Sequence, residues 1–135
     1  MDPDPNDLYA NRAMKSILVV DDDTNIRNLI SEVLREEGIP HVLASSGSEA
    51  VEHHLDPGDH ALVLTDLMMP EGDGLDVLRA FADKNPDLPV IVMSALMDET
   101  EIVNEVEGEP NVVGWLKKPL DIDRLRELIA RVLGG

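Results

Sequence analysis

The sequence contains no cysteine and very few aromatic residues. Without cysteine the chain has no disulfide, no thiol nucleophile and no zinc–thiolate site, and this composition fits a reducing compartment. Its aromatics are one tryptophan, one tyrosine and one phenylalanine, too few for the platform on which single-stranded nucleic acids stack. No apolar run approaches the roughly 20 residues that cross a bilayer, and the N-terminus lacks the features of a secretory signal. We therefore expect a cytoplasmic protein.

Positive charge is also scarce. The 11 lysines and arginines stand against 28 aspartates and glutamates, for a formal net charge of −17. Binding to nucleic acid or to an anionic membrane needs a concentrated basic surface, so we expect direct contact with neither.

The length of 135 residues suits one domain that buries a core without metal or disulfide. Residues 1–14 carry Pro3 and Pro5 and show no hydrophobic periodicity, which predicts a flexible tail. Residues 15–135 are then one folded domain.

Short apolar runs alternate with segments of helical spacing along that domain. The runs predict strands at residues 16–20, 41–44, 61–65, 88–93 and 112–116, and helices follow at about 24–37, 46–55, 74–84, 98–107 and 121–133. Strands that are each followed by a helix pair in parallel, with helices on both faces of the sheet. The sequence therefore predicts a doubly wound α/β domain, for which the strand order 2-1-3-4-5 suits five strands.

Acidic residues follow the first and third predicted strands. Asp21 and Asp22 end the first, and Asp66 ends the third; in the order 2-1-3-4-5 these ends lie side by side. An aspartate after a strand can simply cap a turn. However, gathered carboxylates repel one another unless a cation shares the site, and carboxylate oxygens with room for waters and a phosphoryl oxygen suit Mg²⁺ better than Ca²⁺.

Two more polar side chains reach the same edge of the sheet. Ser94 ends the fourth predicted strand and Lys118 follows the fifth. Acids, a metal, a lysine and a hydroxyl around one crevice can hold a phosphoryl group for transfer. In the absence of cysteine and of a suitably placed histidine, the nucleophile would be a carboxylate, and the product an aspartyl phosphate.

Five motifs in order strengthen this interpretation: ILVVDDD, LVLTDLMMP, the glycine at position 74, VIVMSA and WLKKP. With them, residues 15–134 resemble the receiver domains of two-component response regulators, which have a flavodoxin-like fold. The resemblance implies that a phosphoryl group passes from a phosphohistidine of a sensor histidine kinase, or of a histidine phosphotransfer protein, to the domain. The domain would catalyse its own phosphorylation and dephosphorylation rather than turn over a substrate.

The same resemblance assigns roles at the acidic edge. Asp66 would be the phosphoacceptor. Asp21 and Asp22 would form the magnesium site with Asp66 and the main-chain carbonyl of Met68.

Ser94 would bond to the phosphoryl oxygen, and Lys118, ahead of a cis bond to Pro119, would neutralise it. Trp115 stands where the family has an aromatic that swings inward on activation, although a half-buried strand aromatic needs no such role. The switched surface would consist of the fourth helix, the fifth strand and the fifth helix. It would serve a downstream protein, an effector domain or a phosphorylation-dependent homodimer.

The sequence departs from the family pattern at several positions. Met68 and Leu96 occupy two positions that lie beside the phosphoryl group in the family and vary among its members. Both are apolar here and cannot orient an attacking water, which predicts slow hydrolysis of the aspartyl phosphate. Gly72 replaces a usually apolar residue, and residues 107–115, EGEPNVVGW, differ from the usual approach to the fifth strand. This segment leaves the geometry of the fourth helix open.

Three other interpretations compete with this one. Residues 21–32 partly match a calcium loop, but Ile26 stands where that loop needs glycine. A phosphatase with an Asp-x-Asp-x-Thr strand motif is disfavoured because Asn25 replaces the threonine. A receiver-like binding module that works without phosphorylation is the leading rival. The end at Gly135 fits either a single-domain regulator or part of a longer one.

Overall fold

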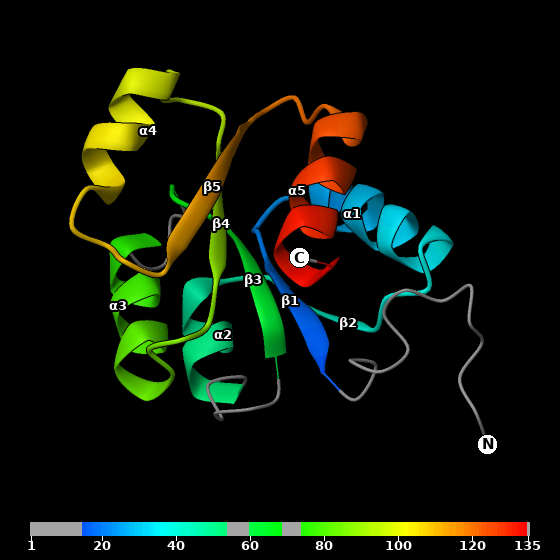
Figure 1. The fold of residues 1–135 in the computed structure, drawn as a ribbon, viewed down its shortest axis with the longest axis horizontal. Coiled ribbons are helices and arrows are strands. Elements are labelled where there is room, and N and C mark those ends of the chain that lie inside the picture. Colours follow the sequence, from blue (N-terminus) through cyan, green and yellow to red (C-terminus); the bar gives the residue numbers. More distant parts are fainter. Residues whose placement is uncertain (1–14, 54–59, 69–73, 135) are drawn as a thin grey trace.

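The computed structural model describes residues 15–53, 60–68 and 74–134, and within them helices and strands alternate. The elements are β1 (Ser16–Val20), α1 (Thr24–Glu36), β2 (His41–Ala44), α2 (Gly47–His53), β3 (His60–Asp66), α3 (Gly74–Lys84), β4 (Val90–Ser94), α4 (Glu99–Val106), β5 (Val112–Lys117) and α5 (Ile122–Gly134). The strands form one parallel sheet in the order β2-β1-β3-β4-β5 (Figure 1). The predicted fold and strand order are confirmed. Residues 1–14, Leu55 and Gly72 lie outside the described residues.

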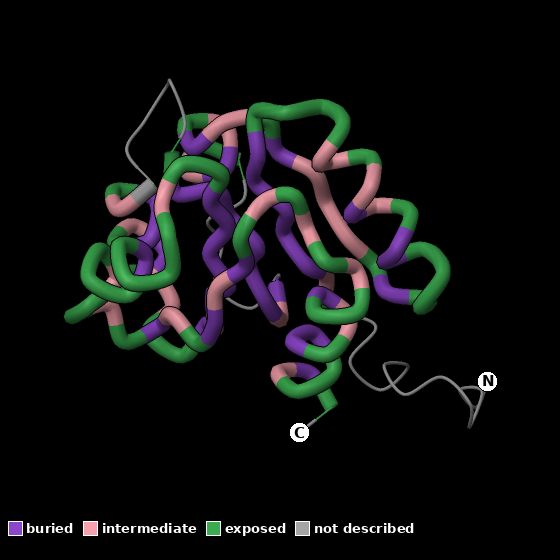
Figure 2. Tube along the Cα trace, turned by 90° about the horizontal axis from the view of Figure 1, so that it is seen from above, coloured by how far each residue is buried: buried purple, intermediate pink, exposed green. Residues whose placement is uncertain are grey.

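The sheet lies between two layers of helices, and its central strands β1, β3 and β4 are buried on both faces (Figure 2). Ile17 and Val19 of β1 pack with residues of α1 and α5, whereas Leu18 and Val20 pack with residues of α2, α3 and α4. Successive side chains of a strand point to opposite faces, so a strand covered on both sides must be apolar throughout. None of the described helices is long and apolar enough to span a membrane.

The fourth strand begins later than its apolar pattern predicts. Leu88 is buried, but its N–H donates to the carbonyl of Asn85 at 3.1 Å and closes a turn. Pro89 has no N–H to contribute to the sheet, so β4 starts at Val90 and extends to Ser94. Hydrophobicity reports burial and not hydrogen bonding, which explains the difference.

Side-chain caps set the starts of two helices near the site. Asp23 Oδ1 accepts from the N–H groups of Asn25 and Ile26 at the start of α1, as its preference for caps predicts. Asp98 and Glu101 form a capping box on α4. Because Asp23 is engaged as a cap, Asp21 and Asp22 are the acids of this loop that remain for a site.

The segment before β5 is tied to the neighbouring turn. The register between β4 and β5 shifts between Val90 and Ile91, and the buried Asn111 donates through Nδ2 to the carbonyls of Asn85 and Leu88 at 3.2 and 2.9 Å. Although residues 107–115 depart from the family pattern, they connect a regular α4 to β5.

The calcium-loop interpretation is wrong, because a strand precedes Asp21 and α1 already begins at Thr24.

Candidate functional site

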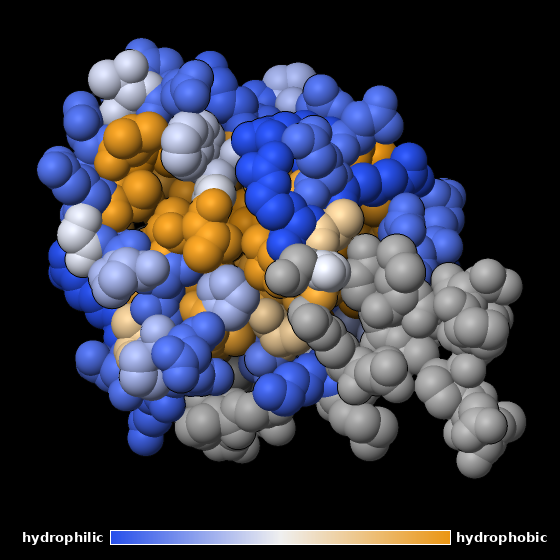
Figure 3. All heavy atoms as spheres, viewed as in Figure 1, coloured by the Kyte–Doolittle hydropathy of each residue, from blue (hydrophilic) through white to orange (hydrophobic). Residues whose placement is uncertain are grey.

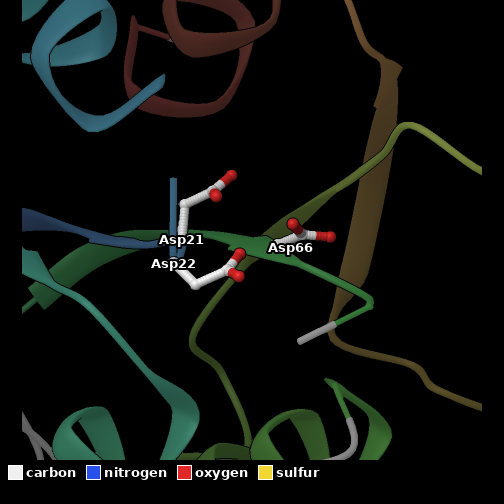
Figure 4. Close-up of side chains that lie close together, drawn as sticks. All are labelled: Asp21, Asp22 and Asp66. Carbon is white, nitrogen blue, oxygen red and sulfur yellow. The ribbon is translucent and has the colours of Figure 1, made fainter. Parts of the chain in front are cut away.

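Three carboxylates meet at the carboxyl edge of the sheet. Asp21 and Asp22 follow β1, and Asp66 is the last residue of β3. One carboxylate oxygen from each lies within 4.8 Å of the other two, and Figure 4 shows the Asp21 and Asp22 side chains extending toward the side where Asp66 lies. The pairing of Val20 with Thr65 brings β1 and β3 to an end at the same level. Parallel pairing therefore produces the convergence that the sequence predicted.

The ammonium of Lys118 bridges the two buried carboxylates. Its Nζ lies 2.6 Å from Oδ2 of Asp21 and 2.8 Å from Oδ2 of Asp66. The main-chain N–H of Lys118 donates to the main-chain carbonyl of Ser94 at 2.9 Å. The Lys118–Pro119 peptide bond is cis, as expected. The end of β5 is thus attached to the end of β4 at the point where the lysine turns toward the acids.

Backbone amides hold the second oxygen of each buried acid. The N–H of Met68 donates to Asp66 Oδ1 and the N–H of Asp23 donates to Asp21 Oδ1, both at 2.9 Å. Asp21 is fully buried and Asp66 is 5% exposed, whereas Asp22 is exposed. The first two carboxylates are therefore fixed by the fold, and the third reaches the solvent side of the cluster.

The local electrostatics favour a second cation in addition to the Lys118 ammonium. Burial raises the pKa of Asp21, and its interactions with Lys118 and the Asp23 amide offset only part of that effect, while the negative charge of Asp66 adds to it. Burial lowers the pKa of Lys118, but its interactions with Asp21 and Asp66 outweigh burial and leave this pKa raised. The site thus holds Lys118 charged but leaves the ionised form of Asp21 at a disadvantage.

This imbalance predicts that Asp21→Asn stabilises the metal-free protein at neutral pH. A group whose pKa is raised by folding contributes stability below its unfolded pKa and loses it as the pH rises through the folded value. For Asp21 the loss begins above 3.8, and an asparagine resembles the protonated acid at every pH. We expect a higher urea midpoint for Asp21→Asn at pH 7 without metal, and a difference that disappears below pH 3.8.

Asp23→Asn is the matched control because it removes one negative charge from the same loop but keeps an equally good helix cap. A lower urea midpoint for Asp21→Asn than for Asp23→Asn would contradict the prediction.

The residues fit a divalent metal ion. Oδ2 of Asp21 is buried and, among the described residues, makes no well-directed hydrogen bond despite the nearby ammonium. When ionised, three carboxylates against one ammonium leave two net negative charges, which match a divalent cation. Carboxylate oxygens are ligands of hard ions such as Mg²⁺, so Asp21, Asp22 and Asp66 could hold one.

The remaining predicted residues lie on β4, on β5 and in the loops that follow β3 and β4. Ser94 is fully buried, and its Oγ accepts from the N–H of Met97 at 3.1 Å. Trp115 is half-buried and packs against the core cluster that includes Ile102 of α4. Met68 and Leu96 are 46% and 76% exposed.

Arg27, which the sequence motifs do not mark as a site residue, donates through its guanidinium to the main-chain carbonyl of Asp21 at 2.7 Å. A signal was present, because a basic residue near the start of a helix opposes the helix dipole and α1 has no acid in its first turn.

Comparison with known proteins gave concordant matches. The sequence model of the response regulator receiver domain family matches residues 17–130 of this chain. Response regulator RR06 of Streptococcus pneumoniae is 40% identical over 118 residues, which make up 86% of this chain and 54% of that protein. The DNA-binding transcriptional regulator NtrC of Rhizobium meliloti is 35% identical over 118 residues, 87% of this chain and 24% of that protein. The chain thus spans about half or less of these curated relatives.

Solved structures show the same fold. The response regulator TrrA from Thermotoga maritima, solved in complex with Mg²⁺ and BeF, superimposes with a TM-score of 0.75 at 32% identity, over 89% of this chain and all of that one. A response regulator receiver protein from Pseudomonas putida gives a TM-score of 0.77 at 32% identity, over 88% of this chain and 98% of that one.

Proposed function

Because this chain belongs to the response regulator receiver domain family of two-component systems, we propose that Asp66 accepts a phosphoryl group in a magnesium-dependent reaction. The donor is a phosphohistidine of a sensor histidine kinase or of a histidine phosphotransfer protein. The observation that carries the proposal is the position of Asp66, which lies at the carboxyl edge of the sheet, 2.8 Å from the Lys118 ammonium and beside two further carboxylates.

In the proposed reaction an Asp66 oxygen forms a bond to phosphorus while the phosphorus–nitrogen bond of the phosphohistidine breaks, and the imidazole leaves. The N–H of Met68 and the ammonium of Lys118 hold the two Asp66 oxygens, which orients the nucleophile before the donor arrives. Lys118 then neutralises negative charge on the transferred group. Asp66 is the last residue of β3 and Lys118 directly follows β5, so the two groups come from the ends of different strands.

Asp21, Asp22, Asp66 and the main-chain carbonyl of Met68 would hold Mg²⁺. When bound, this ion would offset the charge of the carboxylates and of the phosphoryl oxygens. Asp21 is kept in place for this role by the Asp23 amide and by Lys118.

The proposed output is a change of the surface formed by α4, β5 and α5. Ser94 would turn its hydroxyl toward the phosphoryl group and release the Met97 amide that it now accepts from, and Trp115 would respond on β5. Apolar side chains gather over α4 and β5 between hydrophilic borders (Figure 3), and Val103 and Val113 are 41% and 52% exposed there. Such a patch suits a protein partner, namely a downstream target, an effector domain or a second copy of the domain.

The proposal places the domain in the cytoplasm, where phosphodonors made from ATP are available. It includes no direct contact with nucleic acid or membrane, since the net charge of −17 disfavours both. The domain modifies itself and later loses the group by hydrolysis, so it acts as a switch rather than as a turnover enzyme.

Metal removal tests the proposal. Acetyl phosphate with Mg²⁺ should add one phosphoryl group per chain by intact mass, and excess EDTA should prevent the addition. Trp115 is the only tryptophan, so its fluorescence in the same samples reports the switch and should change less in Ser94→Ala. A chain that stays unlabelled while still capturing a partner would instead favour the binding-module interpretation.

The residues beside Asp66 predict a long-lived phosphoryl group. Met68 and Leu96 carry no group that could hold a water in line for attack. We expect a half-life of minutes or longer after loading with acetyl phosphate and removal of the donor, and a shorter one in Met68→Asn, whose amide can orient water. Intact mass against time measures both, and a wild-type half-life of seconds would contradict the prediction.

A further inference from the structure

Arg27, which no part of the proposed reaction uses, holds the loop that presents Asp22. It lies in α1, half-buried, four residues after the helix cap Asp23. Nη1 of its guanidinium donates to the main-chain carbonyl of Asp21 at 2.7 Å, and Nη2 donates to Thr24 Oγ1 at 3.1 Å. The planar fork of an arginine can make both contacts at once, whereas lysine has only one nitrogen.

Hydrogen bonds hold both peptide groups that border Asp22. The carbonyl of the Asp21–Asp22 peptide accepts from Arg27, and the N–H of the Asp22–Asp23 peptide donates to Asp21 Oδ1. The peptide before Asp21 is held as well, because the Asp21 N–H donates to the carbonyl of Ala44 at 3.1 Å. Arg27 therefore completes a set of bonds that fixes the backbone on each side of Asp22.

The Asp22 side chain depends on that backbone for its direction. It is exposed and makes no hydrogen bond or ion pair with any residue that the structure describes, yet one of its oxygens lies within 4.8 Å of oxygens of Asp21 and Asp66. Asp21 and Asp66, by contrast, are held by amides and by Lys118. A carboxylate without partners of its own stays near the cluster only if its main chain is held.

From this arrangement we infer that Arg27 is a positioning residue for the metal site, which orients Asp22 toward Asp21 and Asp66 by clamping the Asp21 carbonyl. The inference rests on the proposed magnesium site. The two ways in which Arg27 could affect Mg²⁺ binding have opposite signs, because the positive charge of Arg27 by itself repels a cation. If Arg27 acted only through charge, its removal would tighten Mg²⁺ binding; if it acts by holding the loop, removal weakens binding.

The test measures the dissociation constant of Mg²⁺ alone, by calorimetry and by the Mg²⁺-dependent rise of the urea midpoint, in wild type, Arg27→Ala, Arg27→Lys and Thr24→Ala. We expect binding about 10-fold weaker in both Arg27 variants, as is typical when an outer partner of a metal ligand is lost, and a smaller loss in Thr24→Ala. Arg35→Ala is the matched control, since it removes the same charge from an exposed position near the end of α1.

Unchanged or tighter Mg²⁺ binding in Arg27→Ala, wild-type affinity in Arg27→Lys, or an equal loss in Arg35→Ala would each overturn the inference, even if Arg27→Ala lowered stability. Failure of the wild type to bind Mg²⁺ would overturn the magnesium site itself, and is thereby distinguished from failure of the role assigned to Arg27.

Discussion

Asp66→Asn is expected to abolish phosphorylation of the domain by acetyl phosphate or by a phosphorylated kinase. An amide oxygen is a far weaker nucleophile than a carboxylate, and the sequence has no cysteine to replace it. The substitution keeps the shape of the side chain, but its single oxygen can replace only one of the two Asp66 oxygens that now accept from the Met68 N–H and the Lys118 ammonium. Intact mass after incubation with acetyl phosphate and Mg²⁺ should show one added phosphoryl group in wild type and none in the variant.

Asp23→Asn is again the control, because it removes a neighbouring acid that acts as the cap of α1. Its labelling should equal that of the wild type. Stoichiometric labelling of Asp66→Asn would transfer the acceptor role to another residue, and peptide mapping would locate it.

Lys118→Met is expected to have the second largest effect, on both stability and labelling. The side chains of Lys118, Asp21 and Asp66 are 11%, 0% and 7% exposed, so the variant leaves two carboxylates buried without their cation. Removal of one partner from a buried ion pair costs about 3–5 kcal/mol. Loss of one preorganised charge at the reacting oxygens slows the reaction roughly 100- to 1000-fold. Urea unfolding without metal and the labelling rate with saturating Mg²⁺ measure the two effects.

The stability difference has a defined pH range. The pKa of Lys118 is raised above 10.5 by folding, so its contribution is complete below 10.5 and is lost as the pH rises through the folded value. Wild type and Lys118→Met should therefore converge in stability in strongly alkaline solution. Lys117→Met is the matched control, because Lys117 is the exposed last residue of β5. Equal effects of the two substitutions at pH 7 would contradict the special position of Lys118.

Local patterns accounted for most of the fold. The run of apolar residues from Ile17 to Val20 is buried on both faces of the sheet, and Asp23 and Gly38 mark the start and end of α1 as their preferences predict. The pattern was misleading at Leu88, which is buried in a turn and not in the strand. Periodicity reports which residues are hidden from water, whereas the exact end of a strand depends on which N–H groups are paired.

The sequence by itself determined that this is an α/β domain with an acidic edge. Apolar runs alternate with segments of helical spacing, and acids end two of the runs; both are local properties of the chain. Only the tertiary structure decided how those acids are held. Lys118 reaches both Asp21 and Asp66, the amides of Asp23 and Met68 take up the remaining oxygens, and Arg27 fastens the carbonyl beside Asp22. Each of these contacts depends on a direction in space, and the two made by Lys118 join residues that only the packing of the sheet brings together.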